Sequence, residues 1–190
     1  IATGPTFFDE NRAFRVAEAM WRQIAATAAD PENQPEIVDW IIQELPNPSL
    51  AVAESFTAPM GTEEAVLENV AVVLEGTSPE AILVAAPRNT PTVVKVDPLT
   101  HTSGTAVLME LIQVFSARPH QKTLIFLSTE DAAKGGLGIS HFLDTSKYAG
   151  DVSVILSFFG LGKETSEPGR ARILSAGVTA PQNTTPGWYV

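Results

Sequence analysis

Cysteine is absent from this chain of 190 residues, so disulfide bonds and thiolate metal sites are excluded. Histidine is scarce, with 3 copies, and the 12 basic residues are outnumbered by 22 acidic ones. The formal net charge of -10 argues against nucleic acid or an anionic membrane surface as the main partner. No apolar run approaches the roughly 18 to 20 residues that cross a bilayer, so we expect no membrane insertion within this segment.

The overall composition is that of an ordinary globular domain. Apolar residues make up 44% of the chain and charged residues 18%, which is enough for a sizeable core. The length fits one domain over residues 1–190. We expect helices over 1–48, a sheet core over 50–160 and an irregular tail over 161–190. The chain begins without Met or a signal-peptide pattern, so we expect it to have been excised from a longer protein.

Two helices are predicted at the start of the chain. Asp9 is a suitable N-cap for the first, because the apolar residues that follow it recur at helical spacing. Asp30 and Pro31 are typical of the N-cap and first residue of a second helix. The "PNP" sequence at 46–48 is expected to end that helix.

The rest of the chain alternates between strand and helix patterns. Apolar runs predict strands over 50–56, 69–76, 81–86, 122–128 and 151–159. The "GTSPE" sequence between the second and third of these predicts a hairpin turn. Ser103 and Gly104 are expected to open one helix, and "GGLGISHFLD" to begin another. This alternation predicts the α/β class with a largely covered sheet.

The sequence "AAPRNTPTVVKVDPLTHTSG" lies where a strand ends and a helix is expected to begin, a common place for an active site. A zinc site there would normally gather three or more His, Asp, Glu or Cys ligands. Asp97, His101, Glu130 and Asp131 are the residues near the strand ends that could supply it.

Several longer phrases resemble the M28 family of zinc aminopeptidases. They are "NVAVVLEGTSPEAILVAA", the loop ending in "SG", and "ARPHQKTLIFLSTEDAAKGGLGISHFL". The likeness extends from about Phe7 to Gly160. It implies an α/β fold with a mixed, mostly parallel sheet sandwiched between helices and two zinc ions over the strand ends. It also implies C-terminal truncation, because the last histidine of the family would lie beyond Val190.

The resemblance assigns the metal site to residues that cannot perform its chemistry. In the family, one glutamate of a pair is the general base that deprotonates a zinc-bound water, and the other binds metal. The first histidine of the family falls on Pro87, and the aspartate that orients it falls on Asn89. The bridging aspartate falls on Thr100, and the glutamate pair falls on Ala132 and Ala133. A further acidic ligand falls on Ser157. We therefore expect no zinc cofactor and no catalytic residue.

The resulting hypothesis is a catalytically inactive M28-like domain that binds or scaffolds a protein, peptide or lipid partner. In this respect the chain is similar to the Gaa-type subunit of the GPI transamidase, which implies the extracytoplasmic domain of a membrane protein. The alternative is an active metallo-aminopeptidase or other hydrolase whose site has been rebuilt near His101 and Glu130, with Asp97 and Asp131 as further ligands.

Overall fold

The computed structural model describes residues 7–32, 36–60, 62–88, 98–130, 136–158, 161 and 171–174. The helices are α1 (Glu10–Ala29), α2 (Ile37–Glu44), α3 (Pro98–Ser116) and α4 (Leu137–Thr145), with short 3-10 turns η1 (Pro48–Leu50) and η2 (Ala149–Asp151). The strands are β1 (Ala51–Met60), β2 (Glu63–Leu74), β3 (Ser78–Pro87), β4 (Lys122–Thr129), β5 (Val152–Phe158) and β6 (Ala171–Leu174).

Helix α1 begins as the sequence predicts. The Asp9 side chain accepts hydrogen bonds from the backbone N–H groups of Asn11 and Arg12, and so caps the first turn. The prediction that Asp30 caps the second helix is wrong. Its backbone N–H donates to Ala26 O at 3.0 Å and closes α1 instead, and α2 begins only at Ile37.

One mixed sheet of six strands, in the order β1-β2-β4-β3-β5-β6, forms the centre of the chain. The α/β class and the mixed sheet are confirmed. The expectation that the sheet is mostly parallel is corrected, because among the described strands the β3–β4 and β3–β5 pairs alone are parallel. The other three pairs, β1–β2, β2–β4 and β5–β6, are antiparallel.

The hairpin predicted at "GTSPE" is also wrong, because β4 lies between β2 and β3. The connection passes beside the start of β4, where the Ser78 N–H donates to Gln121 O at 2.7 Å. The physical reason is that β4 is buried along almost its whole length and needs a neighbour on each side. The observed hairpin joins β1 to β2, with Met60 opposite Glu63.

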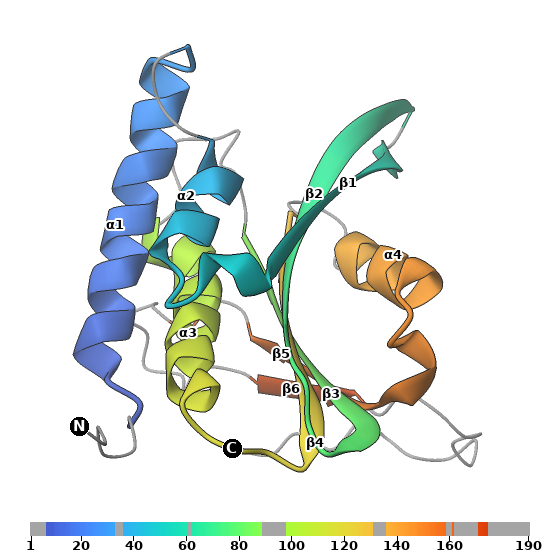
Figure 1. Cartoon of the computed structure of the whole chain (residues 1–190). Coiled ribbons are helices and arrows are strands. Elements are labelled where there is room, and N and C mark those ends of the chain that lie inside the picture. The colour runs from blue at the N-terminus through green and yellow to red at the C-terminus, as the bar shows by residue number, and fades with distance from the viewer. Residues whose placement is uncertain are drawn as a thin grey trace.

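Helices cover both faces of the sheet, as predicted. Figure 1 shows α1, α2 and α3 on one side and α4 on the other. The larger apolar core lies under the three helices and includes Met20, Ile41, Leu108 and Phe126. A smaller core, which includes Phe142, lies under α4. Among the residues described, no helix is both long and apolar enough to span a membrane.

Two boundaries differ from the expectations. Helix α3 begins at Pro98, ahead of the predicted start at Ser103, because proline is well suited to the first turn of a helix. The tail expected to be irregular contributes β6, which pairs with β5 and extends the sheet. Sequence patterns of four residues are too short to distinguish such a strand from a loop.

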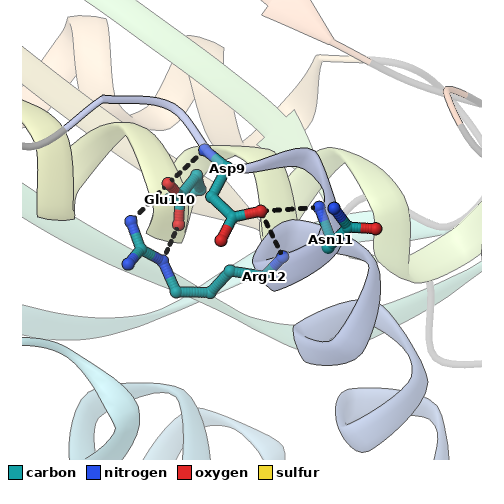
Figure 2. Close-up of polar contacts among 4 residues, drawn as sticks. All are labelled: Asp9, Asn11, Arg12 and Glu110. Atoms are coloured by element: carbon teal, nitrogen blue, oxygen red, sulfur yellow. Dashed lines mark hydrogen bonds and ion pairs between the residues drawn. The ribbon is translucent and has the colours of Figure 1, made fainter.

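A polar cluster joins the start of α1 to α3 (Figure 2). The Glu110 carboxylate accepts from Asp9 N–H at 2.8 Å and from Arg12 Nη2 at 2.6 Å, and it also contacts Arg12 Nε. The Glu110 side chain is only 2% exposed, whereas that of Arg12 is 37% exposed. One buried carboxylate therefore fixes the end of one helix on another.

Candidate functional site

The carboxyl ends of β3, β4 and β5 meet at one edge of the sheet because these strands run parallel to each other. Pro87 at the end of β3 lies opposite Thr129 of β4, and Ala85 lies opposite Ser157 of β5. Glu130 follows directly after β4. Ligands in open α/β sheets commonly bind outside this edge, so the structure brings Pro87, Glu130 and Ser157 to a common candidate site.

The other predicted site residues are placed only in part. Asn89, Asp97, Asp131, Ala132 and Ala133 lie outside the described residues. Thr100 and His101 lie in the first turn of α3, where the structure describes the backbone alone. The substitution of their family counterparts therefore stays a prediction from the sequence.

The described side chains at this edge do not fit a zinc ion. Pro87 has no donor atom in its side chain, and Ser157 offers one half-buried hydroxyl. Glu130 Oε2 accepts from the Glu68 backbone N–H at 3.2 Å. Within the described part of the chain, no three His, Asp or Glu side chains come together as metal ligands, and zinc needs three or four.

A buried arginine lies at the carboxyl ends of β3 and β4, beside the middle of β2. Arg88 is 2% exposed, and its guanidinium donates to Ser128 O and to Glu68 O, each at 2.8 Å. Burial lowers the pKa of Arg88 to about 10, and the carboxylates of Glu130 and Glu68 oppose that change. Arg88 is still protonated at neutral pH, so this edge carries a fixed internal cation.

Two glycines in the motifs that resemble the M28 family are required by close packing at this edge. A Cβ on Gly104, from the "SG" motif, would lie 2.8 Å from Phe158 O and 3.1 Å from Ala86 Cβ. A Cβ on Gly138 would lie 2.4 Å from Asn69 Oδ1. Both glycines allow a helix to approach the sheet closely, which is a packing requirement independent of metal chemistry.

A groove of about 790 Å³ lies beside this edge, between α1, the start of α2 and the first half of β2. Trp21, Ile24, Ile37 and Val66 provide most of its apolar wall. The charged residues among its described lining are Glu36, Glu68 and Glu130, all acidic. Sequence reasoning missed this groove; the apolar residues within "EEAVLE" were the signal that β2 begins early enough to form one wall.

The fold defines the class: the chain has an M28-like α/β fold, that of zinc-dependent exopeptidases and glutaminyl cyclases. No family model matches the chain, and no curated protein matches it. Three solved structures illustrate the likeness. A glutaminyl cyclase of an Acidobacteriales bacterium is 14% identical, with a TM-score of 0.62, and the match covers 86% of this chain and 62% of that one.

The other two structures give the same result. The Porphyromonas gingivalis glutaminyl cyclase is 16% identical, with a TM-score of 0.60 and coverage of 83% of this chain and 61% of that chain. A zinc-dependent exopeptidase from Parabacteroides distasonis is 12% identical, with a TM-score of 0.56 and coverage of 85% and 64%. The chain thus spans less than two thirds of each of these proteins. The fold predicted from the M28 resemblance is confirmed.

Proposed function

We propose that this chain is a catalytically inactive M28-like domain that acts as a binding or scaffolding module. The observation that supports this is the donor chemistry at the strand ends, where Pro87 and Ser157 stand at positions that carry metal ligands in the resemblance. The carboxylate of Glu130 is engaged with the Glu68 backbone. The buried guanidinium of Arg88 adds a positive charge that disfavours a nearby Zn²⁺.

Metal content and turnover test this proposal together. The purified chain is incubated with Zn²⁺, dialysed and analysed by mass spectrometry for bound metal. It is then assayed with an aminoacyl-p-nitroanilide and with a peptide that begins with Gln, because structural relatives include exopeptidases and glutaminyl cyclases. We expect the zinc content after dialysis to stay within about 10% of background, far below one ion per chain. We also expect no turnover of either substrate.

Stoichiometric zinc together with hydrolysis would show instead an active enzyme with a rebuilt site. In that case His101→Ala and Glu130→Gln should each abolish metal binding, because these residues are the predicted replacement ligands. Glu10→Gln, on an exposed carboxylate in the first turn of α1, is the control and should leave metal content unchanged.

We further propose that the domain lies outside the cytosol as part of a membrane protein. The support for this is the resemblance to the Gaa-type subunit. Fusion of alkaline phosphatase to the domain within its full-length parent tests the compartment, since that enzyme is active only in an oxidising environment. An inactive fusion that is nevertheless well expressed would contradict this location.

A further inference from the structure

In the part of the chain that the structure describes, the first half of β2 has a strand partner on one edge only. The β2–β4 ladder begins at Asn69, opposite Thr129, whereas β2 itself begins at Glu63. Within the described residues, β2 pairs only with β1 and β4, so 63–68 form an overhang that is paired on the β1 side alone. The Glu130 N–H donates to Glu68 O, and the Glu130 carboxylate accepts from the Glu68 N–H. The pairing of β2 with β4 ends at these two bonds.

The backbone groups that face this free edge follow from the register. Residues of an antiparallel strand direct their N–H and C=O groups alternately to one neighbour and to the other. The β1–β2 register has no bulge, and Glu68 directs both of its groups toward Glu130. Val66 and Glu64, two and four residues earlier, therefore direct theirs to the same side, where they continue the line of β4.

The groove described above borders this edge. Val66 is 70% exposed and lies in the groove wall opposite Trp21 and Ile37. The acidic side chains of Glu36, at the start of α2, and Glu68, on β2, also line the groove, and the exposed Glu64 lies on the overhang itself. One face of this site is thus apolar, one edge offers backbone hydrogen bonds, and the charged side chains described in the groove lining are negative.

We propose that the overhang of β2 and its groove form a docking site for an extended, basic segment of a partner protein. The segment adds as a strand in line with β4 and pairs with Val66 and Glu64. Its apolar side chains contact Trp21, and its Lys or Arg side chains pair with the glutamates. This inference rests on the proposed binding function and specifies the chemistry of the partner.

Two further features favour this edge over the outer edge of β1. Pro59 occupies an outward-facing position on β1, where proline removes a hydrogen-bond donor and blocks strand addition. The overhang is also held in place from its other face, because Phe56 of β1 stacks on His141 of α4 with ring centroids 4.2 Å apart. A preorganised edge loses less conformational entropy when a strand is added.

The register supplies a matched pair of variants for the test. Val66→Pro removes an N–H on the free edge of β2, and Thr57→Pro removes one on the opposite edge of the same hairpin, directly across the ladder. The probe is a decapeptide of alternating Lys and Val with a free N-terminus and a C-terminal fluorescein label, measured by fluorescence anisotropy. We expect Val66→Pro to weaken binding by about fivefold or more, and Thr57→Pro to change it by less than about twofold.

The chemistry of the peptide tests the same site without altering the protein. N-methylation of alternate peptide groups should weaken binding in one register and spare it in the other, since strand addition uses alternate N–H groups. A Glu-Val decapeptide should not bind, and Glu64→Gln with Glu68→Gln should weaken the Lys-Val peptide by about two- to fivefold per substitution. Equal binding of the acidic peptide, or equal effects of the two proline variants, would overturn the proposal.

Mass spectrometry of the peptide after incubation distinguishes failure of the docking site from failure of the proposed function. An intact peptide that does not bind overturns the docking site and leaves the inactive binding module standing. A cleaved peptide overturns the proposed function itself.

Discussion

Arg12→Met is expected to lower the free energy of unfolding by about 3–5 kcal/mol, because it leaves a buried charge without its partner. Glu110 is 2% exposed and has its carboxylate in contact with Arg12 Nε and Nη2 (Figure 2). After the substitution, the Asp9 N–H is the hydrogen-bond donor to that carboxylate that remains among the described residues. Urea denaturation followed by circular dichroism measures the change as a shift in midpoint at constant slope.

Two variants identify burial as the cause. Arg22→Met on the same helix breaks an exposed pair with Glu18, whose atoms are 3.6 Å apart, and should cost less than about 0.5 kcal/mol. The double variant Arg12→Met/Glu110→Met should recover much of the loss, since an apolar pair has no charge to desolvate. If Arg12→Met proved no more costly than Arg22→Met, the substitution would not leave an uncompensated buried charge on Glu110.

The parts of the fold that the sequence predicted are those with a strong local signal. β4 was predicted from its continuous apolar run, and the start of α1 from Asp9 at the cap position. Strand pairing carries no such local signal. The hairpin at "GTSPE" was wrong because β4, some 45 residues further along the chain, pairs with both strands that the turn connects.

The sequence predicted where on the sheet the candidate site lies, but it did not predict the buried charge or the groove beside it. Pro87 and Ser157 lie on adjacent strands near the same edge, because strand order in a parallel unit fixes that edge. The burial of Arg88 was missed because an arginine after a strand usually points into solvent. The groove was missed because its walls come from α1 and β2, and their contact depends on tertiary packing alone.

Gly138→Ala is expected to lower the free energy of unfolding by about 2–4 kcal/mol, the sum of an overpacking cost and a lost buried hydrogen bond. The added methyl would lie 2.4 Å from Asn69 Oδ1 and 2.7 Å from Thr129 Cβ, both on strands under α4. Thr129 and Asn69 are each 1% exposed, so neither can move aside into solvent. Helix α4 must shift outward, which also breaks the 2.9 Å bond from Asn69 Nδ2 to Gly138 O.

Gly150→Ala is the matched control, because a Cβ at Gly150 meets no atom within 4 Å; it should change stability by less than about 0.5 kcal/mol. The double variant Asn69→Ala/Gly138→Ala should cost less than the sum of its two single variants, since Asn69→Ala removes the nearest clashing atom. If the two losses of unfolding free energy simply added, the clash of the new methyl group with Asn69 would not be a cause of the destabilisation. The same measurement connects fold to site, because Asn69 is the residue at which the β2–β4 ladder begins and the free edge of β2 ends.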